Sequence, residues 1–412
     1  MKKIITLLIL LQITGLFSQE RELIEGVMQK DQAKADTPFQ LRTEHTLRGN
    51  LTFIANNTLN RSNNGNGQSA NNPYNGNGSN SDHNGASNMD YIDIDSDPTT
   101  FSSSSATLNL PNCSKVTYAG LYWAAIYPYE EWKDEEFGVN TRDDDFNEMK
   151  FKLPGASNYI DVVADKFDAT ARELIYDDGI TTEKPYVCYK DVTGLIQGLA
   201  NPNGVYYGAN IKATKGRDTF GSSLGSSAGW ILVVIYENET ESRKKFFVFD
   251  GFATIKVNEG EDESVYDVPF SGFTTIPTGP VAANFLVGSL EGDQKIENDR
   301  FELQDTSGNF QKLTTGSLNP IDNFFNSSIT YNNSYLGGRT PDSENTLGLD
   351  ADFFELNNPS NSLIGNNQSS GVMRFSSTQD SYWPFLLGLS VEVIEPSIRL
   401  VKTIDDGIDQ GS

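Results

Sequence analysis

The chain of 412 residues has a formal net charge of −25, with 56 Asp and Glu against 31 Lys and Arg. So negative a field repels nucleic acid phosphates and anionic lipid headgroups, which excludes both as favourable partners. The 24 Phe, 17 Tyr and 4 Trp can fill a sizeable core, and beside 36 Gly they are typical of an all-β protein.

The N-terminus has the pattern of an export signal. Met1-Lys2-Lys3 precedes an apolar run from Ile4 to Phe17, and Ser18-Gln19 offers a small-residue cleavage point. This run is too short to span a bilayer as a helix, and no later run reaches the length of about 18 residues that spanning needs. We therefore expect a signal peptide over 1–18, an extracellular location at the cell surface, and no membrane-spanning segment.

Two segments near the N-terminus lack the apolar periodicity of a core. Residues 19–44 are polar and charged, and they predict a flexible leader. The tract 63–88 consists mainly of Asn, Gly and Ser and predicts a long exposed loop. This loop is either a spacer or, with Tyr74, a source of amide groups for a carbohydrate surface. Between the two segments, residues 46–55 predict a first strand that is interrupted at Gly49-Asn50.

Strand signals recur from residue 105 onwards. Residues 105–110 alternate apolar and polar side chains, and 116–126 are nearly all apolar, which predicts a central strand buried on both faces. The strongest hairpin signal joins 230–236 to 246–249 through a polar loop. The one helix expected is a short one within 192–199.

These short strands, punctuated by Gly, Asn and Pro, predict an all-β fold. We expect a large β-sandwich or jelly-roll-like head domain over 45–396, with long loops and little helix. The segment 397–412 starts as an alternating strand directly after Pro396. It therefore indicates the first strand of a following domain that is truncated here.

The sequence contains only two cysteines, Cys113 and Cys188. In an exported protein an even pair most simply predicts one disulfide, and two separate buried thiols are the alternative. Because each cysteine flanks or lies in a strand-like segment, we expect a Cys113–Cys188 disulfide that clasps neighbouring strands.

Three aspartates alternate in the run Asp93-Ile94-Asp95-Ser96-Asp97. If this run is extended, its carboxylates share one side and repel each other unless a cation lies among them. Ca²⁺ prefers such oxygen ligands. The run therefore predicts a calcium site at Asp93, Asp95 and Asp97, and a solvated acidic edge strand is the alternative.

Patterns of known enzyme classes are weak in this sequence. Residues 221–225 and 225–229 both fit G-x-S-x-G, but a strand rather than a helix follows them, and the only histidines, His45 and His83, lie upstream. Zinc-binding and phosphate-cradling motifs are absent. A glycosidase needs only a pair of carboxylates, so it stays open as an alternative. We expect a protein that is not an enzyme.

Several runs together resemble the N-terminal head domain of large surface adhesins exported by the type IX secretion system, of which gliding-motility adhesins are the best known. The matching runs, in chain order, are 49–54 with 59–61, 93–97, Tyr118-Ala119-Gly120-Leu121-Tyr122-Trp123, 230–236 leading to 249–252, 345–352 and 376–384. The tail Arg399-Leu400-Val401-Lys402-Thr403-Ile404-Asp405 resembles the first strand of the immunoglobulin-like repeats that follow such domains.

This resemblance implies a non-catalytic head domain for cell adhesion. Its partners would be the type IX secretion machinery during export and, afterwards, an extracellular surface, a protein or a glycan. The resemblance carries over no ligand-binding residues. A secreted carbohydrate-binding or glycan-hydrolysing protein and a purely structural cap of a surface filament are the alternatives.

Overall fold

The computed structural model describes residues 35–62, 69–76, 83–127, 143, 145–168, 170–177, 184–216, 225–258 and 260–394. The expected signal peptide 1–18 and the tail 397–412 lie outside these ranges. The described chain consists of strands and loops with one short α-helix, α2 (Thr193–Gln197), and one 3-10 turn, η1 (Asn84–Ala86). The expected all-β fold with little helix is therefore confirmed. Over these ranges, no helix has the length and apolar character needed to cross a membrane.

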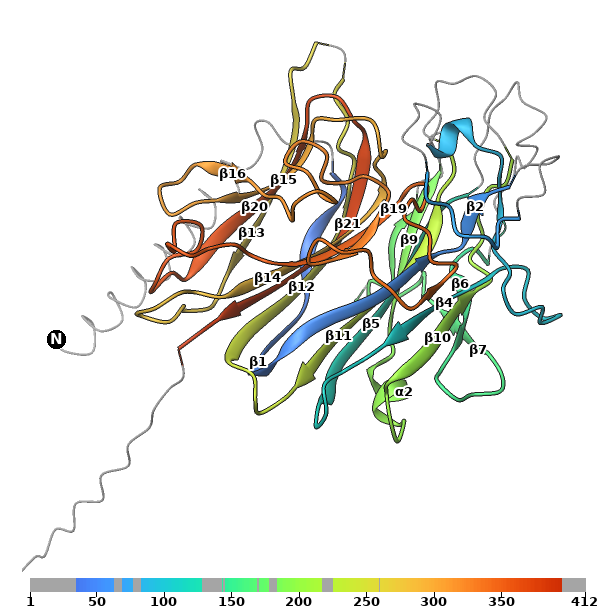
Figure 1. Cartoon of the computed structure of the whole chain (residues 1–412), viewed down its shortest axis with the longest axis horizontal. Helices are drawn as coiled ribbons and strands as arrows, with labels where there is room; N and C mark the ends of the chain where they lie inside the picture. Colours follow the sequence, from blue (N-terminus) through green and yellow to red (C-terminus); the bar gives the residue numbers. More distant parts are fainter. Residues whose placement is uncertain are drawn as a thin grey trace, which may run out of the picture.

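The strands form one large sheet and three smaller ones (Figure 1). The ten-stranded sheet has the order β17 (Ile329–Tyr331), β19 (Leu349–Glu355), β14 (Ala283–Glu291), β21 (Tyr382–Glu392), β12 (Arg243–Ala253), β1 (Ala35–Asn57), β11 (Ala228–Glu237), β5 (Lys115–Ile126), β9 (Pro185–Asp191) and β8 (Leu174–Asp177). The five-stranded sheet has the order β18 (Arg339–Thr340), β4 (Ser103–Leu108), β10 (Gly204–Ala209), β6 (Glu148–Lys152) and β7 (Ile160–Val163). The four-stranded sheet has the order β13 (Ser264–Ser271), β20 (Ser370–Ser377), β15 (Asp299–Gln304) and β16 (Phe310–Lys312), and a two-stranded ladder joins β2 (Leu59–Arg61) to β3 (Met89–Tyr91).

Strand β1 divides the ten-stranded sheet into two halves. Its residues up to Arg48 pair with β12, and its residues from Gly49 pair with β11. A Cβ atom on Gly49 would lie 1.9 Å from the carbonyl oxygen of Tyr236, so only glycine fits where β1 passes from one partner to the other. We call the strands from β17 to β12 the β12 half, and those from β11 to β8 the β11 half.

Two predictions fail because of β1. Residues 35–44 were expected in a flexible leader, but they form the first part of this strand; residues 19–34 lie outside the described ranges. The expected hairpin between 230–236 and 246–249 does not form, because β1 lies between β11 and β12 and pairs with both. The two strands are adjacent in sequence but not in the sheet.

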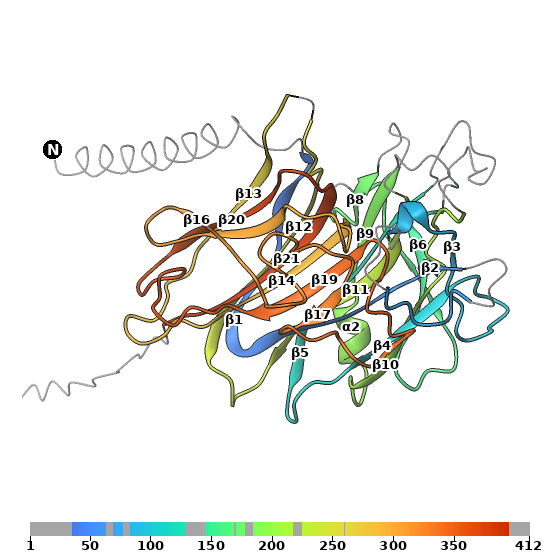
Figure 2. The same ribbon diagram turned by 45° about the horizontal axis from the view of Figure 1, so that its top comes forward.

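The sheets stack into four layers with three cores between them. The five-stranded sheet packs on the β11 half around Trp123, Trp230 and Phe151. The two halves of the large sheet pack on each other, since a Cβ on Gly288 of β14 would lie 2.8 Å from the side chain of Ile231 on β11. The four-stranded sheet packs on the other face of the β12 half around a phenylalanine-rich core. Figures 1 and 2 show the four-stranded sheet and the five-stranded sheet at opposite ends of the molecule.

Alternation along each inner strand produces these shared cores. In β5, Leu121 and Trp123 belong to the core with the five-stranded sheet, whereas Tyr122 and Ala124 belong to the core between the two halves. The prediction that 116–126 is buried on both faces is therefore confirmed.

The described part of the Asn-rich tract is packed against the domain and is not a free loop. The side-chain amide of Asn60 donates to the carbonyl oxygens of Ala70 at 2.9 Å and Asn72 at 2.8 Å. Asn84 and Gly85 are buried, and the Asn84 amide donates to Glu291 at 2.8 Å. The expectation of an exposed loop holds for Ser69, for residues 71–73 and for Asn75, which are exposed, and it is wrong for Ala70, Asn84 and Gly85, which are buried.

Candidate functional site

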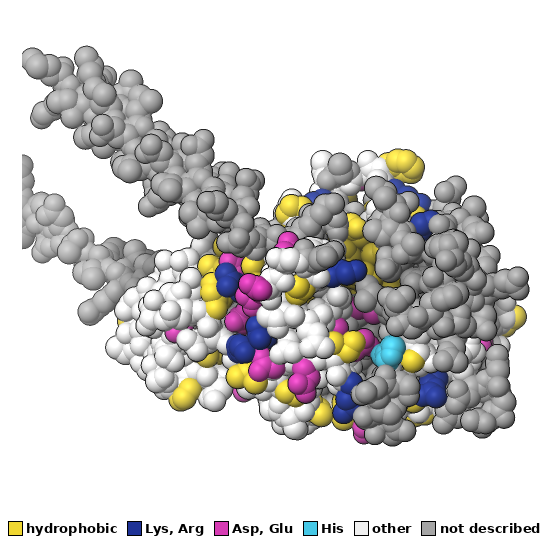
Figure 3. Space-filling model, turned by 90° about the horizontal axis from the view of Figure 1, so that it is seen from above, with side chains coloured by type: hydrophobic (Ala, Val, Ile, Leu, Met, Phe, Trp, Pro, Cys, Tyr) yellow, Lys and Arg dark blue, Asp and Glu magenta, His cyan; other side chains and the backbone are white. Residues whose placement is uncertain are grey.

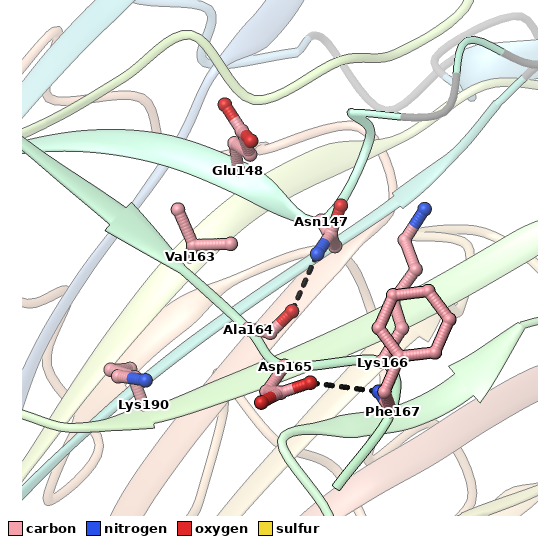
Figure 4. Close-up of a pocket in the computed structure, with 8 residues that line it drawn as sticks. All are labelled: Asn147, Glu148, Val163, Ala164, Asp165, Lys166, Phe167 and Lys190. Atoms are coloured by element: carbon pink, nitrogen blue, oxygen red, sulfur yellow. Dashed lines mark hydrogen bonds between the residues drawn. The ribbon is translucent and has the colours of Figure 1, made fainter.

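An open pocket lies at the edge of the five-stranded sheet, where the chain leaves β7 (Figure 4). Its volume is about 760 Å³. The lining combines apolar, amide and charged side chains: Asn147, Glu148, Val163, Ala164, Asp165, Lys166, Phe167 and Lys190. They come from the beginning of β6, the end of β7 with its following loop, and the end of β9.

Hydrogen bonds fix the backbone of this pocket. The Asn147 amide donates to the carbonyl of Ala164 at 2.5 Å, and the Ala164 N–H donates to the carbonyl of Asn147 at 3.0 Å. In the next residue of this loop, the Asp165 carboxylate accepts from the N–H of Phe167 at 2.8 Å (Figure 4). Asn147 and Asp165 thus hold the loop rather than offering all their polar atoms to a ligand.

Glu173 holds the same loop in place. Its carboxylate accepts from the N–H of Asp165 at 2.7 Å and from the Lys190 ammonium at 2.8 Å. Lys190 therefore lines the pocket as one half of an ion pair, in a position set by β9.

Phe167 is the unusual residue of this pocket. Its side chain is 95% exposed, whereas most other large apolar side chains of the described chain are buried. Ile160 and Val163 on the edge strand β7 are also exposed, but they are three residues apart and therefore lie on opposite faces of the strand. The neighbouring Lys166 ammonium lies 4.2 Å from the ring centroid of Phe146 and is therefore turned toward a buried ring. The pocket offers an aromatic face with charged groups around it.

The pocket does not have the environment of a glycosidase site. Glu148 and Asp165 are both exposed, and Asp165 accepts N–H bonds from Phe167 and Asp168. A general acid for glycoside cleavage is kept protonated by an apolar, water-poor surrounding, which neither carboxyl group has. The arrangement supports binding better than cleavage.

The carboxylates of the three aspartates expected at a calcium site each accept hydrogen bonds from neighbouring protein groups. Asp93 accepts from Ser103, Asp95 from Thr100 and the N–H of Asp97, and Asp97 from Thr99. Ser96 has a φ of 55°, so the run is not the extended strand that would align the carboxylates.

Asp95 also accepts a hydrogen bond from the Tyr159 hydroxyl. Although partial burial opposes ionisation, the hydrogen bonds, that from Tyr159 foremost, lower the pKa of Asp95. Over the described ranges, no three His, Cys, Asp or Glu side chains are grouped as ligands of one ion. The local geometry therefore does not favour the expected site, and calcium at Asp93, Asp95 and Asp97 stays a prediction.

The expected Cys113–Cys188 disulfide is wrong. Cys188 is buried in β9 opposite Trp123, near the end of β5, whereas Cys113 is exposed in the turn before β5 begins at Lys115. At the rise of a strand, this separation is more than about 20 Å, and a disulfide needs Cα atoms within about 7 Å. The two cysteines flank one strand pair, but at opposite ends of it.

The serine of the pattern 225–229 is not accessible as a nucleophile. Ser227 is 1% exposed, and its hydroxyl donates to Glu291 at 3.2 Å. This hydroxyl is therefore part of a buried polar contact.

Sequence reasoning missed a group of buried carboxyl groups between the β12 half and the four-stranded sheet. Burial raises the pKa of Asp299 and of Asp352 to about 7, and it raises the pKa of Asp350 and Asp380 well above the ordinary range. A signal existed at Asp350 and Asp352, because they alternate with apolar residues in a strand that is otherwise typical of a core.

Comparisons with known proteins leave the family of this chain open. No family model and no curated protein matches the sequence. One similar solved structure is PBCV-1 VP54, fitted into a reconstruction of the virophage Sputnik, with a TM-score of 0.21, 7% identity, and coverage of 85% of this chain and 95% of that chain. Another is the STIV MCP, with a TM-score of 0.20, 9% identity, and coverage of 70% and 92%. Structural similarities with TM-scores this low give no information about function.

Proposed function

We propose that this chain is the non-catalytic head domain of an exported cell-surface adhesin and that the pocket at Phe167 binds a glycan. The observation that carries the proposal is the nearly complete exposure of Phe167 beside an open pocket. An aromatic side chain left in water costs free energy, so its exposure fits a surface that meets a partner.

The chemistry of the pocket fits a sugar. A pyranose ring presents C–H groups on its face, which stack on an aromatic ring, and hydroxyl groups around its rim, which bond to charged and amide groups. Phe167 supplies the ring, and Glu148 supplies an exposed carboxylate on the other side of the pocket.

The adhesin part of the proposal rests on the sequence. The apolar run after Lys2-Lys3 supports export, and the resemblance to type IX adhesin heads supports display at the cell surface. On the face shown in Figure 3, acidic and basic side chains lie interspersed among apolar ones, which suits a soluble extracellular domain.

A glycan array probed with the mature protein tests the proposal. We expect binding to a restricted set of glycans that Phe167→Ala weakens by about tenfold or more, since burial of an aromatic ring contributes about 1.5–3 kcal/mol. The matched control is Ile321→Ala, which removes an exposed apolar side chain (48%) outside the pocket and should leave binding unchanged.

Other outcomes of this experiment identify the rival functions. Release of reducing sugar from a bound glycan would identify a hydrolase. No binding to any glycan, with a correctly folded protein, would refute the glycan part and leave a protein ligand or a structural cap.

A further inference from the structure

Several buried oxygen atoms between the β12 half and the four-stranded sheet accept no hydrogen bond. They are Asp299 Oδ2, Asp350 Oδ2, Asp352 Oδ2, Asn323 Oδ1 and Ser328 Oγ. The side chains of Asp299, Asp350 and Asp352 are completely buried. Oxygen atoms withdrawn from water without a partner cost free energy, and native structures seldom leave several in one place.

One short segment brings two of these carboxylates together. The N–H of Phe325 donates to Asp299 Oδ1 at 2.6 Å, and the N–H of the next residue, Asn326, donates to Asp350 Oδ1 at 2.8 Å. The N–H of Ser328 adds a third bond, to Asp350 Oδ1 at 3.1 Å. Two consecutive amides of one segment thus hold Asp299 and Asp350, and each carboxylate has its second oxygen left over.

Gly292 lies against the same group. A Cβ on this residue would meet the carbonyl oxygen of Phe325 at 2.6 Å and Asp350 Oδ2 at 2.8 Å. Both oxygens thus lie close to the Gly292 backbone and leave no room for a side chain at this position. The φ of Gly292 is 92°, so the backbone there also favours glycine.

No basic side chain of the described chain forms a salt bridge with Asp299 or Asp350. Arg300, the residue after Asp299, forms its salt bridges with Glu263 and Asp322 instead. Two adjacent carboxylates buried without a cation are strongly unfavourable when ionised. Either they hold protons or a cation that is not part of the polypeptide balances them.

We propose that Asp299 and Asp350 bind one divalent, oxygen-preferring cation of the Ca²⁺ type between the two sheets. Since no three acidic, His or Cys side chains of the described residues gather around one point, neutral oxygens must complete the shell. The Phe325 carbonyl and the Ser328 hydroxyl are the available ones, and Ca²⁺ accepts carbonyls, hydroxyls and water beside carboxylates. The cation would join β15, β19 and the segment 323–328.

Terbium luminescence tests this site, because Tb³⁺ replaces Ca²⁺ and emits when a nearby aromatic ring transfers energy to it. Tyr382 is the reporter: it is fully buried, and its ring lies 4.3 Å from that of Phe325. After treatment of the whole mature protein with chelator, we expect one Tb³⁺ to bind with sensitised emission and Ca²⁺ to displace it. Tyr382→Phe should lower the emission several-fold while calorimetry still measures one bound ion.

Asp350→Asn and Asp299→Asn should each weaken binding by more than about tenfold, since loss of even an outer-shell partner costs about 10–100-fold in metal affinity. Both keep the shape of the carboxylate, and circular dichroism checks their fold. Asp305→Asn, in the exposed turn after β15, is the control and should bind as the intact protein does. If Asp350→Asn and Asp299→Asn bind the ion as tightly as the intact protein, the proposal is wrong. It is also wrong if the chelator-treated protein takes up no ion.

The same titration separates this site from the aspartates at 93–97. There Tyr159, which bonds Asp95, would be the sensitiser. Emission that is lost in Tyr159→Phe and Asp95→Asn, but kept in Tyr382→Phe and Asp350→Asn, would place the ion at the turn and refute the interior site.

Discussion

At the scale of single residues, Asp250 connects the proposed glycan pocket to the core. It is fully buried on β12, where it pairs with Arg42 of β1 through bonds of 2.5 Å and 3.1 Å and accepts the hydroxyl of Tyr122 at 3.1 Å. The guanidinium of Arg42 also donates to the carbonyls of Ala171 at 2.7 Å and Arg172 at 2.9 Å. Arg172 itself lies 3.4 Å from Asp250, so two ion pairs of Asp250 fix the loop that begins with Asp165 and Phe167.

Asp250→Ala should lower the free energy of unfolding by about 3–5 kcal/mol, because it leaves the Arg42 cation buried without its partner. It should also weaken glycan binding, since the pocket loop loses its anchor. Urea denaturation measures the first effect. The control is Asp161→Ala, which removes a solvent-exposed partner of Lys150 and should change stability little. Equal effects of the two variants would refute this account.

The burial of Glu291 predicts that the stability of the fold decreases as the pH rises. It is 2% exposed; burial and then the charge of Asp293 raise its pKa well above the ordinary range, while Asn84 and Ser227 donate to it. Its folded pKa lies above the unfolded one. Its contribution to stability is therefore fully present below the unfolded pKa, about 4.3, and is lost as the pH rises through the folded value.

Glu291→Gln should abolish this part of the pH dependence, because glutamine has similar shape and cannot ionise. We expect the variant to gain stability over the intact protein as the pH rises from 5 to 9, measured by urea denaturation at each pH. The difference between the two proteins isolates Glu291 from the other buried carboxyl groups. A difference that shrinks with rising pH would contradict the assignment.

The two cysteines should react independently of each other. Cys113 is exposed and Cys188 is buried opposite Trp123, so a thiol reagent should label Cys113 in the native protein and Cys188 only after unfolding. Mass spectrometry of the labelled peptides measures this. If both residues resist labelling until a reductant is added, the two cysteines do form a disulfide and this prediction is wrong.

At the scale of secondary structure elements, local patterns predicted the strands but not their partners. The apolar run 116–126 predicts β5 because an almost continuous apolar sequence itself indicates a strand that is buried on both faces. The pairing of β11 with β1 places Val233 opposite Phe53. These residues are far apart in the sequence, so no local sequence pattern can predict their contact. The expected hairpin failed for this reason, since adjacency in sequence is only the commonest case.

The candidate site was less predictable than the fold. Phe167 stands in a polar segment with no periodic pattern, and only its exposure in the structure distinguishes it from a core phenylalanine. The aspartates at 93–97 had a clear alternating pattern, but the left-handed backbone at Ser96 interrupts the extended strand, and nearby hydroxyl and N–H groups bond the carboxylates. Asp299 and Asp350 meet only through the segment 323–328, which belongs to neither strand.

A substitution of Gly49 tests how β1 joins the two halves of the large sheet. Gly49→Ala places a Cβ against the Tyr236 carbonyl and the Leu47 side chain, so we expect a loss of at least about 1–3 kcal/mol in unfolding free energy. Gly194→Ala is the matched control: its Cβ would meet no atom within 4 Å, and alanine favours the helix α2. A loss in Gly194→Ala but not in Gly49→Ala would refute the role of β1.

At the scale of the whole molecule, the four layers depend on one another. Each half of the large sheet contributes one face to an outer core and the other face to the central core. Neither half can therefore keep its own fold after the central core opens, because it would expose an apolar face to water. Strand β1 strengthens this dependence, since it provides one continuous backbone to both halves.

We therefore expect the domain to unfold in a single cooperative transition in spite of its size. In a background with Trp132→Phe and Trp383→Phe, tryptophan fluorescence follows the end with the five-stranded sheet, where Trp123 and Trp230 are buried. Hydrogen exchange at the amides of β15 and β20 follows the end with the four-stranded sheet. Both probes should give the same urea midpoint, and Gly49→Ala should shift both midpoints together, because the junction that it strains belongs to both halves. Separate midpoints, or a shift at one end alone, would mean that the molecule is two independent sandwiches joined by a passive strand.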